Sequence, residues 1–171
     1  SEDQSALVSA LQSILEDHSE IPQSERFASF WSDRGLQGQL EAMGFLDAAR
    51  DIGPLEAALV IYEAAKVAGA VETIGRGLVA PLTCPELELT GPVALARRRD
   101  LAAGKAIRNL PVARTLLVED GEDVLALALD GDEIEAVDSI LAYPYGRFAG
   151  EPALDKARRF AGAGAAMRKW W

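Results

Sequence analysis

The hydrophobic positions in the first part of the chain recur at helical spacing. Apolar residues three and four apart form one stripe over residues 6–15, and Ser5 precedes this stripe as a candidate N-cap. A second stripe predicts a further helix that ends before Gly53, and its members are Leu36, Leu40, Met43 and Leu46. The pattern therefore predicts an N-terminal region made of helices.

The clearest helical pattern begins at Gly53-Pro54, where the proline suits the first turn of a helix. One face collects apolar and small residues, namely Leu55, Ala58, Leu59, Tyr62, Ala65 and Gly69. The other face carries the charged residues Glu56, Glu63 and Lys66. Alanine and glycine in the later turns permit close approach by another helix. The helical pattern weakens through Gly75 and Gly77 and ends at Pro81.

Beyond Pro81 the pattern changes to the alternation that is typical of strands. Candidate strands cover residues 86–90, 93–96, 110–118, 124–129 and 133–137. Two acidic turns that contain glycine separate the last three candidates, at residues 119–123 and 130–132, and Asp-Gly favours hairpins. Residues 124–129 are apolar on both faces, so we expect them inside a sandwich or barrel rather than at an edge. The pattern predicts a small antiparallel sheet.

The segment from Pro152 to Trp171 is expected to form a single amphipathic helix. Pro152 suits the first turn, and Glu151 and Asp155 place negative charge near the helix N-terminus. Its apolar stripe consists of Ala153, Ala157, Phe160, Gly164, Met167 and Trp171. No capping glycine or proline closes the far end, so Trp170 and Trp171 would be exposed unless something outside the segment covers them. We therefore expect the chain to be part of a longer protein or one half of an assembly.

Composition narrows the classes of function. The net charge is −10 and the isoelectric point is about 4.6, which argues against a nucleic-acid binder. A local basic cluster, namely Arg97, Arg98, Arg99, Lys105, Arg108 and Arg114, could still hold a phosphorylated small molecule.

The only cysteine, Cys84, excludes an internal disulfide, and the only histidine, His18, disfavours a histidine-based metal site. Because no apolar run is long enough for a membrane span and no signal peptide is present, we expect a cytoplasmic protein.

Spacing alone identifies no catalytic residue, no metal ligand and no cofactor-binding residue. His18 suits a helix C-terminus, Cys84 is typical of an inert thiol, and the acidic turns are typical of solvated hairpins. The glycine pairs at 75–77 and 162–164 lack the strand-to-helix context of a phosphate-binding loop. The aromatic segment 143–148 is either a loop that packs on the core or a contact for a ligand or partner. Composition and spacing therefore define only a helical-plus-β protein.

Three segments resemble the acyl-CoA dehydrogenase family, and they occur in the family's order. Residues 53–70 (GPLEAALVIYEAAKVAGA) are similar to the family's L-E-x-A-L-V-x-E-E-L-G helix, and residues 44–51 (GFLDAARD) to the segment before it. Residues 109–130 resemble the β-domain run of "ADxLLV" type with its acidic turn and following strand. The resemblance implies an α+β fold with an N-terminal helical domain (1–81), a small β domain (82–149) and the start of a C-terminal helical domain (150–171).

The resemblance also implies an activity, namely FAD-dependent α,β-dehydrogenation of a fatty or steroid acyl-CoA thioester. The chain departs from the family in its short β domain, where residues 82–85 only faintly match the T-E-P-x-x-G-S segment and the W-x-I-T segment is missing. The family's catalytic glutamate belongs to the C-terminal bundle, which this chain lacks. The chain would therefore be a fragment or a degenerate subunit that binds FAD with a partner or a missing domain. It would form a homo- or hetero-oligomer through the helix from Pro152 to Trp171. The alternative is a non-enzymatic interaction module that docks through that helix.

Overall fold

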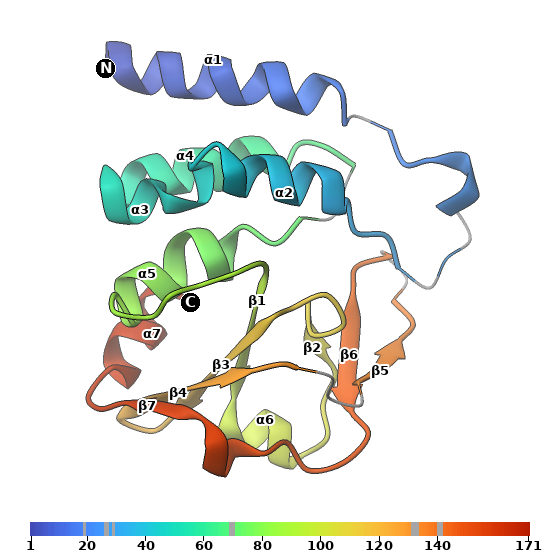
Figure 1. The fold of residues 1–171 in the computed structure, drawn as a ribbon, viewed down its shortest axis with the longest axis vertical. Coiled ribbons are helices and arrows are strands. Elements are labelled where there is room, and N and C mark those ends of the chain that lie inside the picture. The colour runs from blue at the N-terminus through green and yellow to red at the C-terminus, as the bar shows by residue number, and fades with distance from the viewer. Residues whose placement is uncertain (19, 26–27, 29, 69–70, 131–133, 140–141) are drawn as a thin grey trace.

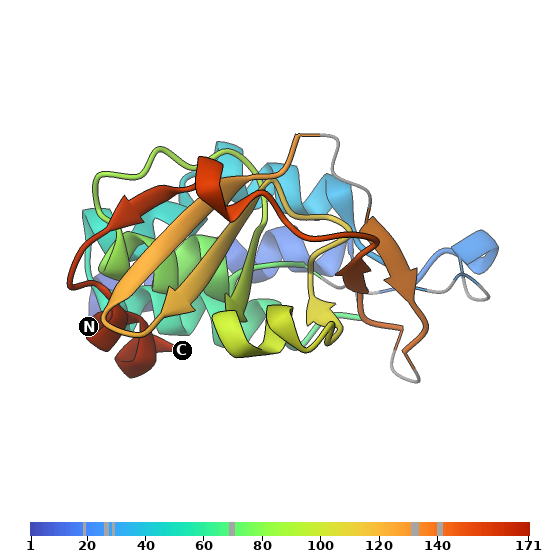
Figure 2. The same cartoon turned by 90° about the horizontal axis from the view of Figure 1, so that it is seen from below.

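The computed structural model describes residues 1–18, 20–25, 28, 30–68, 71–130, 134–139 and 142–171. The fold is α+β, with N-terminal helices, then a β region and then a C-terminal helix (Figure 1). The N-terminal helices are stacked in layers over one sheet, and a second, smaller sheet lies beside the first in both views (Figures 1 and 2). The candidate functional site lies at the boundary between these helices and the sheet.

The N-terminal helices are α1 (Glu2–Glu16), α2 (Arg34–Ala42), α3 (Ala48–Asp51), α4 (Pro54–Ala64) and α5 (Ala80–Thr83). The cap of α1 is Ser1 rather than the predicted Ser5, because Ser1 and Gln4 form a reciprocal capping box. The predicted helix from Leu36 to Leu46 is divided, since α2 ends at Ala42 and a 3₁₀ turn follows at Phe45–Asp47. Gly44 adopts a positive φ of 76° between the two pieces, which ends α2 at this point.

Helix α4 begins at Pro54 as predicted, but it buries a different face. Ala57, Val60 and Ala64 are each 2% exposed, whereas Leu55 and Tyr62 are 58% and 64% exposed. Glu63, which was expected on the polar face, is 6% exposed and accepts a hydrogen bond from Gln12 of α1. Because α4 is apolar around most of its circumference, its periodicity did not determine which face would meet the neighbouring helices. The predicted extension of this helix towards Gly69 is wrong, since α4 ends at Ala64.

The first sheet contains β1 (Val93–Arg97), β3 (Thr115–Asp120), β4 (Asp123–Ala128) and β7 (Arg158–Phe160), in the order β1-β3-β4-β7. The second contains β2 (Ile107–Arg108), β6 (Tyr145–Phe148) and β5 (Ile134–Val137), in the order β2-β6-β5. The expected antiparallel arrangement holds except for β1, which runs parallel to β3 with Leu95 opposite Leu117. Helix α6 (Arg98–Ala102) lies in the connection that permits this parallel pairing.

The predicted strands agree with the observed ones unevenly. Residues 86–90 form no strand, although their exposure alternates as predicted and Leu87 and Leu89 pack against the core. The strand expected from residue 110 begins only at Thr115, because Asn109 has a φ of 65° and starts a turn. The acidic turn at 119–123 is a hairpin in which Asp120 pairs with Asp123. The second acidic turn was predicted at residues 130–132, and residues 131 and 132 of it lie outside the described residues.

Strands β3 and β4 have both faces buried, which explains their continuous apolar sequence. Leu117, Val124 and Ala126 face a core shared with α5 and α7, whereas their sequence neighbours belong to a second core on the opposite face. β4 pairs with β3 on one side and with β7 on the other, so it lies inside the sheet as predicted. A separate core of leucines and alanines holds the N-terminal helices together.

The predicted helix from Pro152 to Trp171 is wrong over most of its length. Leu154–Lys156 is a 3₁₀ turn, Arg158–Phe160 is strand β7, and only α7 (Gly164–Trp170) is α-helical. The helical spacing of its apolar residues was overridden by pairing with β4, in which Phe160 lies opposite Val124. Gly162 then reverses the chain with a φ of 72° before α7 begins. Met167 of α7 is fully buried against the sheet.

Candidate functional site

A cavity of about 570 Å³ lies where the N-terminal helices meet the first sheet. Its walls come from the end of α4, residues 71–75, strands β1 and β2, and two aromatic residues, Tyr143 and Trp171. Cavities of this size are typical of sites for small molecules and cofactors. We call it the interlayer pocket.

Strand β1 contributes Val93, Leu95 and Ala96 to the lining of the interlayer pocket. The C-terminus, which carries Trp171, and strand β2, which carries Arg108, lie on opposite sides of β1 in both views (Figures 1 and 2). Both residues line the pocket. Trp171 and Arg108 thus reach the pocket from elements on either side of β1, and we call the parts that they line the Trp171 end and the Arg108 end.

The middle of the pocket is mainly apolar. The helical wall presents Ile61 and Ala64 of α4 together with Val71 and Ile74, and the strand wall presents Val93, Leu95 and Ile107. Small alanines at 64, 65 and 68 leave the space that larger side chains would fill. These walls suit an apolar chain or the face of a flat ring system.

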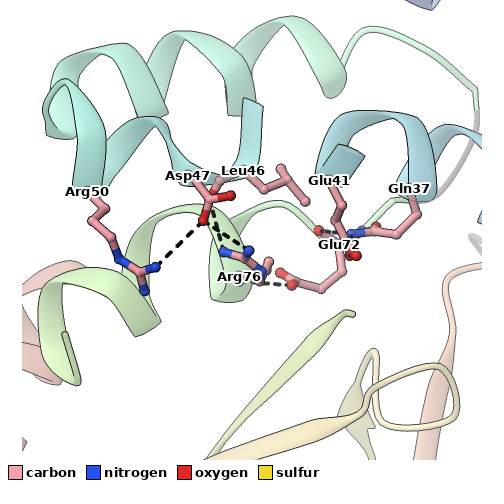
Figure 3. A network of polar contacts seen from close by, with 7 residues as sticks. All are labelled: Gln37, Glu41, Leu46, Asp47, Arg50, Glu72 and Arg76. Carbon is pink, nitrogen blue, oxygen red and sulfur yellow. Dashed lines mark hydrogen bonds and ion pairs between the residues drawn. The ribbon is translucent and has the colours of Figure 1, made fainter. Parts of the chain in front are cut away.

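Glu72 forms part of the wall and fixes the two layers to each other (Figure 3). Its carboxylate accepts hydrogen bonds from the backbone N–H groups of Gly75, Arg76 and Val93 at 2.5, 2.9 and 3.0 Å. Its own backbone pairs with the Gln37 side chain of α2 in both directions, at 2.8 and 3.1 Å. Burial raises the pKa of the Glu72 carboxyl, and the three backbone donors act in the opposite direction. Glu72 thus holds α2, the 75–79 helical turn and β1 in one arrangement.

Arg76 connects the same turn to the preceding helices (Figure 3). One guanidinium nitrogen donates to the Leu46 carbonyl at 3.3 Å and another pairs with Asp47 at 3.0 Å. Asp47 is also 3.9 Å from Arg50. Since Arg76 is only 7% exposed, its pairing with Asp47 keeps a buried charge compensated. This pairing fixes the 75–79 turn, whose first residue lines the pocket, to the residues that precede α3.

The Arg108 end of the pocket is polar. Lys105 is paired with Asp100 at 2.7 Å, and hydrogen bonding to Lys105 lowers the pKa of Asp100. The Arg108 guanidinium stacks over the Tyr143 ring, 4.2 Å from its centre. Among the described residues, no carboxylate lies within salt-bridge distance of Arg108. Arg108 is therefore stacked on an aromatic ring and has no ion-pair partner in the part of the chain that the structure describes.

A second, more open cleft lies beyond the Trp171 end. It is lined by Arg97, Arg98, Arg99, Ala102, Glu119, Gly121 and Arg168. Arg98 pairs with Asp120 and Arg168 pairs with Glu119, whereas Arg97 and Arg99 form no ion pair with any described residue. The Arg97 guanidinium lies 5.2 Å from the centre of the Trp171 ring. The Arg97–Trp171 contact thus joins this arginine cleft to the interlayer pocket.

The basic cluster predicted from sequence is divided by the fold. Lys105 and Arg108 line the interlayer pocket and residues 97–99 line the arginine cleft, whereas Arg114 packs beside Gly91 away from both. Of the aromatic segment 143–148, Tyr143 reaches the pocket.

The sequence analysis missed Glu72 and did not place a ligand at Trp171. The signal for Glu72 was a carboxylate three residues before a helical glycine, the spacing at which a side chain can cap backbone donors.

Apart from Gly75, which lines the interlayer pocket, the other sequence candidates lie outside both cavities. His18 joins α1 to α2 through Asp33 at 2.7 Å and Gln39 at 3.2 Å. Cys84 is fully buried in the core between helices and sheet, and burial raises the pKa of its thiol to about 11. Neither glycine pair, at 75–77 or 162–164, forms a loop around a cavity; Gly75 and Gly164 instead allow close backbone contacts. These residues therefore have structural roles in the described part of the chain.

Three further findings bear on function. Comparisons with protein-family models, curated proteins and solved structures found no match to this chain. In the described residues, no group of three or more His, Cys, Asp and Glu side chains is placed to hold a metal ion. In the same part of the chain, no helix combines the length and apolar composition needed to cross a membrane.

Proposed function

We propose that this chain forms the ligand-binding part of an acyl-CoA dehydrogenase-like flavoprotein that acts with a partner or a further domain. The observation that carries this proposal is the junction at Trp171, where an apolar pocket meets an arginine-lined cleft. Acyl-CoA and FAD both combine an apolar or flat aromatic part with phosphate groups. A site with these two adjoining regions suits such molecules.

The donor groups at the junction fit a phosphate-bearing cofactor. Arg97 and Arg99 have no carboxylate partner among the described residues, so their charge is available to phosphate oxygens. The Trp171 ring, 46% exposed, offers an aromatic face on which a flavin or adenine ring can stack. Bound FAD would supply hydride acceptance. We therefore assign phosphate binding to the arginines and ring stacking to Trp171.

The chain's own residues serve binding rather than proton abstraction in this proposal. The two carboxylates that line the interlayer pocket among the described residues are Glu72 and Asp100. Glu72 uses both oxygens to accept backbone hydrogen bonds, and Asp100 is paired with Lys105. Neither is free to remove a proton from a substrate. The catalytic base would come from the partner or the further domain, and we expect this assembly to work in the cytoplasm.

The proposal is tested by measuring binding of FAD and of octanoyl-CoA to the purified chain by equilibrium dialysis. Riboflavin is the control for FAD because it keeps the ring system and lacks phosphates. We expect FAD to bind at least tenfold more tightly than riboflavin, and Arg99→Gln to remove most of that difference. Arg147→Gln is the matched control, since Arg147 is an exposed arginine on β6 that pairs with Glu135 away from the cleft. Equal weak binding of FAD and riboflavin, with no octanoyl-CoA binding, would contradict the proposal.

A second candidate function, a protein-interaction module, is favoured by the exposed apolar face of α4. Leu55 and Tyr62 are 58% and 64% exposed on this face. The C-terminal segment is less suited to the docking role expected from sequence, because α7 buries Met167 against its own sheet. Sedimentation velocity over a range of concentrations tests self-association, with Leu55→Glu as the disrupting variant. A wild-type chain that stays monomeric throughout would argue against homo-oligomers.

A further inference from the structure

We propose that the Arg108 end of the interlayer pocket recognises an anionic group at the far end of an apolar ligand. The acyl group would then carry its own carboxylate, remote from the thioester. This inference rests on the proposed function for its choice of an acyl chain. The argument for the anion comes from the charges and contacts at Arg108.

Arg108 differs from the other cation that lines this pocket. Lys105 is neutralised locally by Asp100 at 2.7 Å. Arg108 has no carboxylate within salt-bridge distance among the described residues, although its charge helps to lower the pKa of Glu72 in the same pocket. The Glu72 carboxylate is directed to the N–H groups of Gly75, Arg76 and Val93. An incoming carboxylate therefore finds Arg108 available.

The guanidinium of Arg108 has an aromatic partner. It stacks on the Tyr143 ring at 4.2 Å, and stacking leaves the in-plane N–H donors of the guanidinium free. Asn109, the next residue, is fixed by its backbone N–H, which donates to the Pro144 carbonyl at 2.6 Å. The loop that carries Tyr143 is thereby joined to β2. A planar, fixed guanidinium is suited to bidentate binding of a carboxylate.

The position of Arg108 determines which end of a ligand it would meet. The arginine cleft adjoins the Trp171 end of the pocket, and the C-terminus and strand β2 lie on opposite sides of β1 (Figures 1 and 2). A ligand whose phosphates occupy the arginine cleft would extend its apolar part across β1, past Val93 and Ile107. Its far end would then lie beside Arg108. A methyl group there would gain nothing from the charge of Arg108, whereas a carboxylate would pair with it.

The experiment compares two probes that differ by one charge. The monomethyl ester of decanedioic acid carries one neutral ester and one carboxylate, and the dimethyl ester carries two neutral esters. Binding of each to the purified chain is measured by isothermal titration calorimetry at low ionic strength. We expect the monoester to bind about tenfold more tightly than the diester, because Arg108 is exposed and its charge is partly screened.

Variants identify the residue responsible. Arg108→Gln should abolish the preference for the monoester, and Arg108→Lys should retain part of it. Tyr143→Phe keeps the ring and should keep the preference. Arg147→Gln changes the net charge equally on an exposed strand and should also keep it. A monoester preference that survives in Arg108→Gln would overturn the inference, as would equal binding of the two esters to the wild-type chain.

This outcome is separable from that of the proposed function. If FAD and octanoyl-CoA bind but the two esters bind equally, the anion-recognising end is wrong and the proposed function stands. If the monoester preference depends on Arg108 while FAD and octanoyl-CoA fail to bind, the proposed function is wrong. The pocket would then be a site for amphiphilic carboxylates that does not depend on flavin or CoA.

Discussion

At the residue scale, Glu72 illustrates how one buried carboxylate can organise a junction. It is 3% exposed and its side chain accepts three backbone hydrogen bonds from two different layers. Backbone N–H groups that are buried without a partner cost free energy, so a single acceptor that satisfies three of them stabilises the boundary. The cost is the burial of the carboxylate itself, which raises its pKa.

Glu72→Gln is expected to lower the free energy of unfolding by about 2–4 kcal/mol. The glutamine amide nitrogen would face backbone donors that require an acceptor. Denaturant unfolding followed by circular dichroism measures the change. Glu88→Gln is the control, because Glu88 is an exposed carboxylate on the 86–90 segment. Equal stability of the two variants would contradict this role of Glu72.

The raised pKa of Glu72 also predicts a pH dependence. The folded state holds this proton more tightly than the unfolded state, so the unfolded chain releases it first as the pH rises above the ordinary value of 4.5. The contribution of Glu72 to the free energy of unfolding therefore falls as the pH rises through its folded-state pKa. Glu72→Gln should remove this contribution, so the free energy of unfolding should decline less steeply as the pH rises from 4.5 to the folded-state pKa of Glu72. An unchanged slope in the variant would show that Glu72 does not titrate in this way.

At the scale of elements, α4 shows the limit of periodicity as a guide to packing. Its stripe of Leu55, Leu59 and Tyr62 is as apolar as the face that is buried. The buried face was decided by α1 and α3, which pack against α4 on the side of Ala57 and Val60. Small side chains permit closer approach of helix backbones than leucine and tyrosine do. The large residues of α4 were therefore left at the surface.

Val60→Ala should lower the free energy of unfolding by about 1–3 kcal/mol, whereas Leu55→Ala should change it by less than about 0.5 kcal/mol. The difference arises because Val60 is 2% exposed and Leu55 is 58% exposed. Thermal and denaturant unfolding of the two variants measure it. A larger loss of stability in Leu55→Ala than in Val60→Ala would show that the buried face of α4 is the one predicted from sequence.

Replacing glycine by alanine is expected to change the free energy of unfolding in opposite directions in two helices. An added Cβ at Gly164, the first residue of α7, would overlap the Gly121 carbonyl oxygen, so Gly164→Ala should destabilise the fold by about 1–3 kcal/mol. Gly38 lies inside α2 with no atom within 4 Å of an added Cβ. Gly38→Ala should therefore stabilise by about 0.5–1 kcal/mol. Parallel denaturant titrations compare the two, and equal signs would contradict the close contact at α7.

At the scale of the whole molecule, one core joins the helices to the sheet. Val79 and Cys84 on the helical side meet Leu117 and Val124 of the sheet, and Met167 of α7 packs among them. Cys84 is fully buried and its thiol pKa is raised to about 11. A thiol in this environment reacts slowly with reagents unless the two layers separate.

Met167→Ala should destabilise the protein by about 2–5 kcal/mol and accelerate the labelling of Cys84 by a thiol reagent such as DTNB. The reason is that Met167 fills the core in which Cys84 is buried. Met43→Ala is the control, because Met43 is 60% exposed. If both variants leave the labelling rate of Cys84 unchanged, the core does not hold the layers together as described.

Much of the chain's local structure follows from its sequence. The start of α4 at Pro54, the hairpin around Gly121 and the interior position of β4 agree with predictions from proline, acidic glycine turns and two-sided apolar patterning. The candidate site was less accessible to this reasoning. The basic cluster was visible, but its division between pocket and cleft depended on where β1, α6 and β2 place each side chain.

By itself, the sequence determined that helices come first, that a β region follows and that the chain ends in a helix, because turn residues and hydrophobic periods act over a few neighbouring positions. Tertiary structure decided which face of α4 is buried, that β1 runs parallel to β3, and that residues 158–160 join the sheet as β7. It also brought Glu72, Arg108 and Trp171 to one pocket from distant parts of the chain. These outcomes depend on packing and on pairing of backbone groups between remote segments, and such long-range contacts leave no local pattern in the sequence.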